Sequence, residues 1–472
     1  MCGQLSTRWF LILCCFGCVL ADKLGPKKIA LVKESVPSPP LEYHGIPAEW
    51  TEMCEFLERE WRGEEGAIDD ERFRLRGVAI AFRHGERSPI HADASVAGCV
   101  ASREEDRRDF EAYRKLVESD DFAYFLRTDA KFAKFSKIPS SSVCAVGQMT
   151  AEGALQHVKL GKYMREKYAG SNIFSPDSRL DLSVTASQYN RTFQSAIAFT
   201  SSFLFPSKTF VPQILIQASN FTYLCMNRNC QCEKSPKWRS QYENELLSYF
   251  TERSPEEFRR TAELLRTHSA FSRAHDPFQI IDVALGRYVC RRKPLPCFGK
   301  AGCLSYEFLS QLVNETTIRG KVMFDEGERY IAQKLQLVEG HGVLYHLAET
   351  VAKLRKFPHT NSIQIFSGHD VTIAPLLRTL NVPLVDPPHY LSHLVVEVGA
   401  FFQFYEQVDS ASAKDSILLR FIYNGVDVTR YVSFCEDSPN NGGLCAGDRL
   451  ESFVRHEIFQ ALEAKSLSEV CN

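Results

Sequence analysis

Short apolar runs that lead into polar, loop-forming residues recur along this chain and predict its main elements. The run 78–82 reads Val-Ala-Ile-Ala-Phe, which is typical of a strand buried on both faces. A second buried strand is expected at 362–366, and 180–185 alternates apolar and polar residues as a strand does. Apolar residues at helical spacing follow these two strands, over 371–380 and up to Leu204. The pattern predicts an α/β protein in which helices flank a largely parallel sheet.

Two further patterns predict where other elements begin and turn. A helix is expected up to Tyr168, with Thr150 as its N-cap and Gly170 just past its end. Near the C-terminus, the segments 417–422 and 426–431 flank Asn-Gly, the dipeptide that favours a type I′ hairpin turn. Such a hairpin beside parallel strands makes the predicted sheet mixed.

The composition changes along the chain and divides it into parts. Residues 22–71 begin with scattered Lys and Pro and are interpreted as a stem and lead-in. Residues 205–345 are helical in pattern, charged and rich in cysteine. They are interpreted as an inserted cap that shapes the substrate pocket, and the α/β core is expected to comprise 72–204 and 346–472.

The first 21 residues have the character of a targeting segment. After Arg8, thirteen mostly apolar residues run to Ala21 and end in Val-Leu-Ala. A membrane-spanning helix needs about 20 such residues, whereas a signal peptide needs fewer and ends in small residues. Residues 1–21 are therefore interpreted as a signal peptide, with a short signal-anchor as the alternative, and the protein is expected in the secretory pathway.

Twelve of the 16 cysteines lie beyond this leader, and an even number in a secretory chain indicates disulfides. Bonds between the cysteines of 225–232 and those of 290–303 are expected in preference to zinc sites. Cys435 and Cys445 form the easiest local pair. Acceptor sequences for N-glycosylation at 220–222 and 314–316 fit the same compartment.

The charge balance narrows the range of partners. The 472 residues include 56 Lys and Arg against 58 Asp and Glu, which gives a formal net charge of −2. A chain without a polybasic surface is not expected to bind nucleic acid. Contact with a membrane is expected only through the N-terminal segment, if it is uncleaved.

The most informative segment is 83–89, Arg-His-Gly-Glu-Arg-Ser-Pro, directly after the first predicted strand. Gly and Pro end the strand in a loop, at the edge where open α/β sheets bind ligands. The guanidinium groups of Arg83 and Arg87 suit phosphate oxygens, and a neutral His84 between them can attack phosphorus. A solvated charged turn is the alternative, but five fixed positions recur by chance in about one such chain in ten thousand.

The pattern Arg-His-Gly-x-Arg-x-Pro resembles the signature of the histidine acid phosphatases, and the resemblance spans roughly residues 75–460. It implies a histidine-phosphatase-like fold with the inserted cap described above. In that family a His-Asp pair supplies a phosphate-binding imidazole and the acid that protonates the leaving oxygen. The matching pair is His369 and Asp370, which a strand and a helix place at the same sheet edge as His84. An N-capping aspartate beside a structural histidine is the alternative.

Arg191 also falls where a predicted strand meets a predicted helix. The family usually reads Arg-Ser-x-Asp-x-x-Arg-Thr here, and its last arginine is a third phosphate ligand. This chain keeps Arg191 and Thr192 but has Thr185 and Gln188 in place of the earlier arginine and aspartate. The resemblance implies that Arg191 binds phosphate, and a surface helix cap is the alternative.

These residues predict a mechanism without a metal or other cofactor, because side chains supply the positive charge. The surrounding arginines lower the pKa of His84 and keep it nucleophilic in mildly acidic solution. Asp370 is expected to protonate the departing alkoxide and then to activate water against the phosphohistidine.

The segments 421–429 and 433–435 resemble the 2-phosphoxylose phosphatases within the family. That resemblance implies a phosphorylated xylose of the proteoglycan glycosaminoglycan linkage region as substrate and linkage-region glycosyltransferases as partners. It also implies the Golgi lumen or membrane as location, with secretion as the alternative. Three other interpretations stay open: a broad-specificity acid phosphatase, an inositol-polyphosphate phosphatase, and an inactive phosphatase-like binding protein.

Overall fold

A computed structural model describes most of the chain from residue 46 onwards. The described residues are 46–58, 63–66, 73–92, 99–140, 144–175, 178–205, 213–220, 224–225, 230–253, 256–299, 302–326, 330–384, 386–401, 416–435 and 443–472. Residues Glu49–Asn472 form one compact unit. The predicted leader 1–21 and the first part of the predicted stem lie outside the described residues. Among the helices that are described, none has the length and apolar character needed to cross a membrane.

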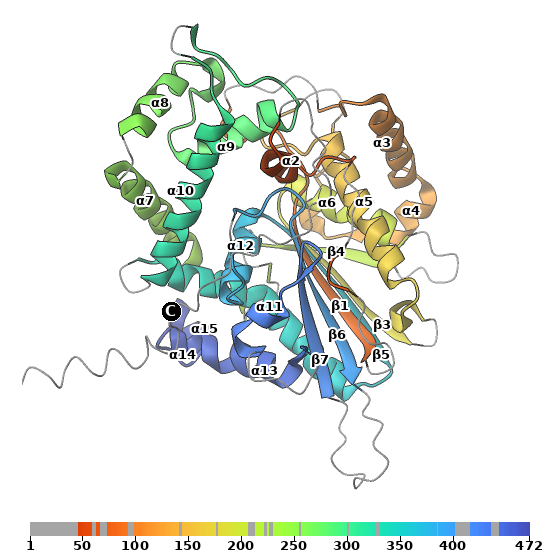
Figure 1. Cartoon of the computed structure of the whole chain (residues 1–472). Coiled ribbons are helices and arrows are strands. Elements are labelled where there is room, and N and C mark those ends of the chain that lie inside the picture. The colour runs from red at the N-terminus through yellow and green to blue at the C-terminus, as the bar shows by residue number, and fades with distance from the viewer. Residues whose placement is uncertain are drawn as a thin grey trace, which may run out of the picture. The chain divides into compact units, whose positions relative to one another are not determined.

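Nine strands of the described residues form one sheet (Figure 1). They are β1 (Phe73–Arg83), β2 (Leu126–Thr128), β3 (Arg179–Ser187), β4 (Ile214–Ser219), β5 (Thr360–Gly368), β6 (His393–Phe401), β7 (Ser416–Tyr423), β8 (Val426–Asp427) and β9 (Cys445–Ala446). Their order is β2-β4-β3-β5-β1-β6-β7-β8, and β9 also pairs with β7. The strands from β2 to β1 in this order run parallel, whereas the pairs from β1·β6 onwards are antiparallel. The predicted mixed sheet is confirmed.

Strand β1 lies between the parallel and antiparallel halves of the sheet, with β5 on one edge and β6 on the other. Its side chains alternate between two cores. Val78, Ile80 and Phe82 join a hydrophobic cluster on one face, and Ala79 and Ala81 join a cluster on the other. The run is apolar at every position because both faces of the strand are covered.

Helices form a layer on each face of the sheet (Figure 1). One layer contains α3 (Glu104–Val117), α4 (Asp120–Phe125), α5 (Ala151–Tyr168) and α6 (Asn190–Phe203). The other contains α11 (Ala332–Lys356), α12 (Asp370–Thr379), α13 (Gly447–Ser452), α14 (Ile458–Ala461) and α15 (Leu467–Cys471). The predicted helices that follow β3 and β5 are therefore confirmed as α6 and α12, one on each face.

Local capping and turn chemistry also follow the sequence in part. The side chain of Thr150 caps α5 by accepting a hydrogen bond from Gly153 N at 3.0 Å, as predicted. Asn424 and Gly425 have φ values of 49° and 81°, as the predicted Asn-Gly turn requires. The returning strand is shorter than the predicted 426–431.

Strand β8 ends at Asp427 because this side chain turns the chain away from the sheet. Its Oδ1 accepts a hydrogen bond from Thr429 N at 2.9 Å, and Thr429–Tyr431 forms a 3-10 turn. An aspartate that bonds the backbone two residues further on favours a turn over an extended strand.

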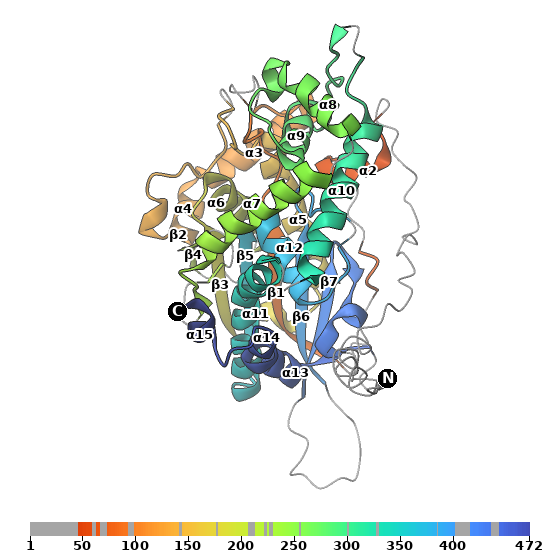
Figure 2. The ribbon, with the colours of Figure 1, turned by 90° about the vertical axis from the view of Figure 1, so that its left-hand side faces the viewer.

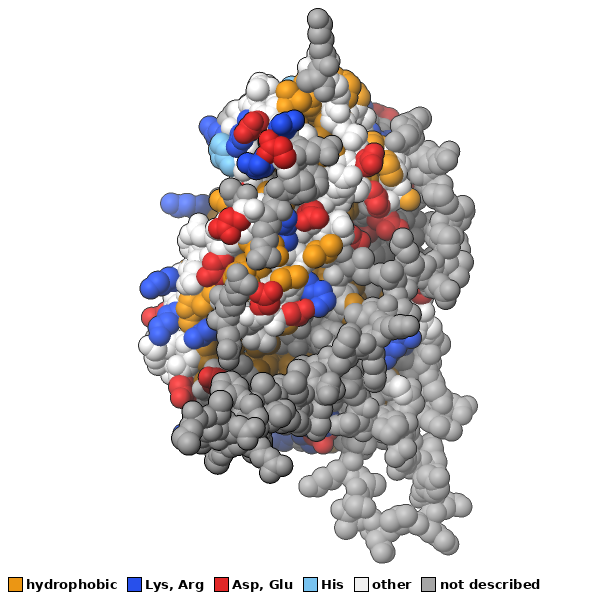
Figure 3. Space-filling model, turned by 60° about the vertical axis from the view of Figure 1, so that its left-hand side comes forward, with side chains coloured by type: hydrophobic (Ala, Val, Ile, Leu, Met, Phe, Trp, Pro, Cys, Tyr) orange, Lys and Arg blue, Asp and Glu red, His pale blue; other side chains and the backbone are white. Residues whose placement is uncertain are grey.

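The interval 205–345, assigned to a cap, contains four helices seen in Figure 2: α7 (Ser235–Arg253), α8 (Glu256–Arg266), α9 (Pro277–Ala284) and α10 (Tyr306–Asp325). Two other elements of this interval are parts of the core. β4 pairs with β2 and β3 inside the sheet, and α11, which begins at Ala332, packs in the core cluster. Acidic and basic side chains are interspersed over the described residues on the face shown in Figure 3.

The predicted lead-in contains a packed helix, α2 (Ala48–Cys54), whose Trp50 is 1% exposed. A disulfide joins Cys54 to Cys290 in the inserted segment. The described residues 49–58 and 63–66 thus belong to the compact unit.

Six disulfides pair the twelve cysteines beyond the leader. They are Cys54–Cys290, Cys99–Cys144, Cys225–Cys230, Cys232–Cys471, Cys297–Cys303 and Cys435–Cys445. The predicted local pair Cys435–Cys445 is confirmed. The expected bonds between 225–232 and 290–303 are wrong, because each of these regions closes one bond within itself and sends its remaining cysteine to a distant part of the fold.

Candidate active site

The predicted site residues follow the carboxyl ends of three neighbouring parallel strands. Arg83, the last residue of β1, is in register with Gly368, the last residue of β5. The backbone N–H of His84 donates to Gly368 O at 3.0 Å and continues this pairing by one residue. On the far side of β5, Ala186 of β3 is in register with Ser367. Residues that follow these three strands therefore converge at one edge of the sheet.

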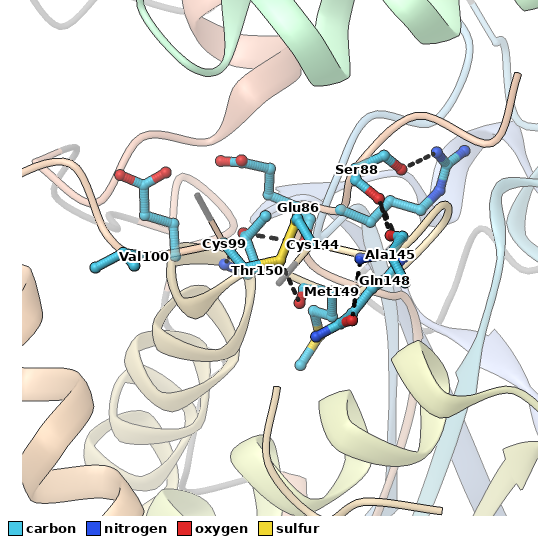
Figure 4. Close-up of a disulfide and its surroundings, with 12 residues drawn as sticks. Glu86, Ser88, Cys99, Val100, Cys144, Ala145, Gln148, Met149 and Thr150 are labelled. Carbon is cyan, nitrogen blue, oxygen red and sulfur yellow. Dashed lines mark hydrogen bonds between the residues drawn. A yellow bond between two sulfur atoms is a disulfide. The ribbon is translucent and has the colours of Figure 1, made fainter. Parts of the chain in front are cut away.

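The loop that carries the heptad is held by the segment before α5. Ser88 N donates to Gln148 O at 2.9 Å, and Thr150 N donates to Glu86 O at 3.0 Å (Figure 4). The Ser88 hydroxyl also donates to Ala145 O at 2.5 Å. These three contacts fix the conformation of the loop.

Two further constraints act on the same loop. A Cβ at Gly85 would collide with the backbone of Gly153 in α5, so only glycine allows this approach. The disulfide between Cys99 and Cys144 closes the supporting segment (Figure 4). The glycine of the heptad thus serves packing, and the residues beside it serve the site.

His84 is 1% exposed, and its Nδ1 lies 2.8 Å from Gly85 O. Because a carbonyl oxygen only accepts, Nδ1 carries the proton, and the lone pair of the neutral ring is on Nε2. Burial lowers the pKa of His84 well below its usual value, and the charges of Arg191, Arg83 and Arg87 lower it further. The imidazole is therefore neutral in mildly acidic solution and can act as a nucleophile.

Arg83 and Arg87 are both buried, and Nη atoms of each guanidinium contact other groups of the protein. Arg83 Nη1 donates to Pro388 O at 2.6 Å, and its Nη2 lies 3.0 Å from Asp370 Oδ2. Arg87 Nη1 donates to Asp282 Oδ1 at 2.6 Å. These contacts fix the orientation of both planar groups.

Arg191 lies in the first turn of α6, and His369 immediately precedes α12. Arg191 Nη2 donates to His369 Nδ1 at 3.4 Å, so the proton of the neutral ring is on Nε2, which lies 2.7 Å from Ser187 Oγ. The rings of His369 and His84 are 5.4 Å apart between centroids. Burial lowers the pKa of Arg191 to about 10, and the nearby Arg87 contributes.

One polar atom of each arginine in this cluster is buried and unused. The Nε atoms of Arg83, Arg87 and Arg191 have no hydrogen-bond partner among the residues that the structure describes. Unsatisfied buried donors are costly, and three of them around one imidazole are the donors that a tetrahedral oxyanion would satisfy. The arrangement can bind a phosphoryl group beside the nucleophile without a metal ion.

The side chain of Asp370 is 42% exposed, and its Oδ2 lies 3.0 Å from Arg83 Nη2. Burial alone would raise the pKa of Asp370, but Arg83 and Arg87 outweigh it and lower the pKa to about 2. Asp370 is therefore held as a carboxylate. Its other oxygen, Oδ1, accepts a hydrogen bond from Val371 N at 2.9 Å.

The structure thus brings together all six residues that the sequence assigned to the site. They are Arg83, His84, Arg87, Arg191, His369 and Asp370. The two positions that depart from the family pattern have other uses: Thr185 is buried in β3, and Gln188 Nε2 donates to Ser219 O at 3.3 Å. His157 is fully buried, with its ring centroid 4.6 Å from that of Phe82.

Sequence reasoning missed three side chains that hold the predicted residues in place. Asp282 pairs with Arg87, Ser187 bonds His369, and the guanidinium carbon of Arg83 lies 4.7 Å from the ring centroid of Tyr390. None of the three stands in a recognisable motif. Asp282 in particular comes from the inserted segment, far from the heptad in sequence.

One group of potential metal ligands occurs in the described part of the chain: Cys225, Cys230 and His346. The two cysteines form a disulfide, so neither offers a thiolate to a metal ion.

Comparison with known proteins finds a family match over part of the chain and relatives over most of it. Residues 74–279 match the model of the histidine phosphatase superfamily (branch 2). The chain is 25% identical over 452 residues to 2-phosphoxylose phosphatase 1 of Danio rerio, covering 89% of this chain and 86% of that protein. The human protein of the same name is 26% identical over 412 residues, covering 83% and 79%. The chain therefore carries a histidine phosphatase superfamily domain and is homologous to these proteins, which supports a phosphoric monoester hydrolase.

Among solved structures, the apo form of Hafnia alvei phytase is similar with a TM-score of 0.45 and 13% sequence identity. The similarity covers 84% of this chain and 99% of the phytase chain.

Proposed function

We propose that this chain hydrolyses phosphomonoesters through a phosphohistidine on His84, and that its substrate is the 2-phosphate of xylose in the proteoglycan linkage region. The observation that carries the reaction is the set of three unused guanidinium donors around a neutral, buried imidazole. A tetrahedral dianion can accept hydrogen bonds from all three Nε–H groups, whereas no described group of the cluster accepts one from them.

In the first step, Nε2 of His84 forms a bond to phosphorus while the bond from phosphorus to the ester oxygen breaks. A dianion bound by Arg83 and Arg87 offsets both cations and raises the pKa of Asp370 from its unliganded value. Asp370 can then carry the proton that the leaving alkoxide takes. The products are the free alcohol and phosphohistidine.

In the second step, the Asp370 carboxylate accepts a proton from water as the water oxygen attacks phosphorus. The bond between phosphorus and Nε2 breaks, which regenerates neutral His84 and releases inorganic phosphate. The hydrogen bond from Nδ1 to Gly85 O keeps the imidazole oriented through both steps.

The substrate is proposed from the homologues, which are named 2-phosphoxylose phosphatase 1 and match over most of the chain. Six disulfides support residence in the secretory pathway, and the same resemblance supports our proposal of the Golgi lumen or membrane as its location. Linkage-region glycosyltransferases are the proposed partners, since they build the chain that bears the phosphate.

The test compares wild type with His84→Ala on three substrates: a phosphorylated linkage oligosaccharide, phytate and a small aryl phosphate. We expect the highest kcat/KM on the linkage oligosaccharide, an acid-labile phosphoprotein trapped in wild type, and neither activity nor trapping in His84→Ala. A higher kcat/KM on phytate overturns the substrate. Equal, negligible activity of both proteins on all three substrates shows a phosphatase-like binding protein.

A further inference from the structure

The inserted segment makes direct contact with the loop that carries the heptad. Asp282 lies in α9, and its side chain is 11% exposed. One carboxylate oxygen, Oδ1, accepts from Arg87 Nη1 at 2.6 Å. The other, Oδ2, accepts from the backbone N–H groups of Ile90 at 2.7 Å and His91 at 3.3 Å. A single carboxylate therefore joins a proposed phosphate ligand to the backbone that follows it.

The contact with Asp282 decides which edge of Arg87 faces the anion. Both hydrogens of Nη1 are used, one by Asp282 and one by Ser88 O at 3.0 Å. The buried Nε lies on the opposite edge of the planar group and is one of the three unused donors of the cluster. Fixing Nη1 thus directs the Nε edge of the guanidinium toward the oxyanion.

The backbone of the same segment is packed closely against this loop. A Cβ at Gly286 would lie 2.9 Å from Pro89 N and 3.1 Å from Arg87 O, so a larger residue does not fit. Gly286 belongs to a π-helical stretch, Leu285–Val289, that directly follows α9. Beyond it, Arg291 Nη1 donates to Glu86 Oε1 at 3.1 Å. The inserted segment therefore holds both ends of the loop 86–91.

We infer that Asp282 is a positioning residue that orients Arg87 and the loop after it for phosphate binding, so that the inserted segment is part of the phosphate site. This inference rests on the proposed phosphatase function. The competing account is purely electrostatic: a carboxylate that neutralises Arg87 would weaken anion binding, and its removal would strengthen it.

The experiment measures inhibition of the full-length protein by inorganic phosphate together with kcat and KM. Asp282→Asn preserves size, and we expect KM and the phosphate inhibition constant each to rise about tenfold, with a smaller change in kcat. Asp282→Glu keeps the charge but moves it, and it should also raise the inhibition constant. A lower constant in Asp282→Asn, or no change in Asp282→Glu, overturns positioning in favour of simple neutralisation.

A double-mutant cycle with Arg87→Ala separates positioning from general destabilisation. If Asp282 acts through Arg87, Asp282→Asn adds nothing to the inhibition constant of Arg87→Ala, and a further rise there contradicts the inference. Asp276→Asn is the matched control: Asp276 caps the same helix by accepting from Gln279 N at 3.0 Å, and its loss should leave phosphate inhibition unchanged. Failure of the wild type to turn over any phosphomonoester overturns the proposed function, and calorimetric phosphate binding by the same variants then decides the role of Asp282.

Discussion

Nη2 of Arg83 lies 3.0 Å from Oδ2 of Asp370, so the guanidinium that pairs with the proposed acid also carries one of the three buried Nε donors without a partner among the described residues. Arg83 ends β1 and Asp370 begins α12 after the neighbouring strand β5. The ion pair keeps the pKa of Asp370 at about 2 until an anion competes for the arginine. Substrate binding itself therefore prepares the carboxyl group to carry a proton.

Replacing Asp370 with Asn should reduce activity according to the leaving group. A general acid typically contributes about 10²–10⁴-fold, and the benefit is greatest when the departing oxygen is strongly basic. We expect Asp370→Asn to lower kcat by about 10²-fold or more on a sugar phosphate and much less on p-nitrophenyl phosphate. Steady-state kinetics on both substrates measure the two losses, and equal losses would falsify the role of Asp370 as proton donor.

Replacing Arg191 should shift the pH dependence of the reaction. His84 must be neutral to attack phosphorus. Burial is the largest cause that lowers its pKa well below the usual value, and the positive charge of Arg191 is the second. Removing this charge in Arg191→Gln raises the pKa of His84, so the acidic limb of kcat/KM should move up by about one pH unit. Arg191→Lys keeps the charge and serves as the control. Measuring all three proteins on one substrate cancels the titration of the substrate, and a limb that stays in place in Arg191→Gln contradicts the electrostatic account of His84.

The sequence alone predicts those parts of the site whose positions follow from the order of strands, loops and helices along the chain. A run buried on both faces and then a loop places His84 at the end of β1, and the same pattern places His369 and Asp370 at the end of β5. Parallel pairing of neighbouring strands then brings the two loops together without further information. The convergence of these residues follows from secondary structure and sheet topology alone.

Other features depend on contacts between distant segments and leave no local pattern. Asp282 resembles any aspartate of an amphipathic helix until α9 is placed against the heptad loop. Disulfide connectivity cannot be read from spacing, so Cys290 was expected to pair with the wrong region. The predicted returning strand of the hairpin, 426–431, is longer than β8. The Asp427 side chain ends β8 by accepting a hydrogen bond from Thr429 N, but in sequence an aspartate fits a strand edge and a turn equally well.

Glu86, the fourth residue of the heptad, should make stability depend on pH. Burial and the neighbouring Glu152 raise the pKa of Glu86 to about 8, although Arg291 opposes the shift. A raised pKa means that the folded state binds the proton more tightly. The resulting stabilisation is complete below the usual carboxyl pKa and is lost as the pH rises through about 8.

Glu86→Gln replaces the protonated acid with a neutral group of similar shape and should remove this dependence. The free energy of unfolding of Glu86→Gln minus that of wild type should increase with pH, by at most about 1.4 kcal/mol per pH unit between about pH 5 and pH 8. Denaturant unfolding at several pH values measures the difference. The comparison at about pH 5, where both proteins carry a neutral side chain, is the internal control, and a difference that is constant with pH would show that Glu86 is ionised in the folded protein.

The disulfide between Cys54 and Cys290 should contribute more to stability than the one between Cys297 and Cys303. The first joins residues 236 apart in sequence and ties α2 to the inserted segment, whereas the second joins residues 6 apart. A cross-link that closes a longer loop restricts the unfolded chain more, so replacing the long-range pair with Ser should cost about 2–5 kcal/mol and the short-range pair less. Denaturant unfolding under non-reducing conditions measures both double variants. Since Cys290 adjoins Arg291, which bonds Glu86, the long-range variant should also raise the inhibition constant for phosphate, and the short-range variant should not. Equal costs in the two variants would exclude loop closure as the source of the stabilisation.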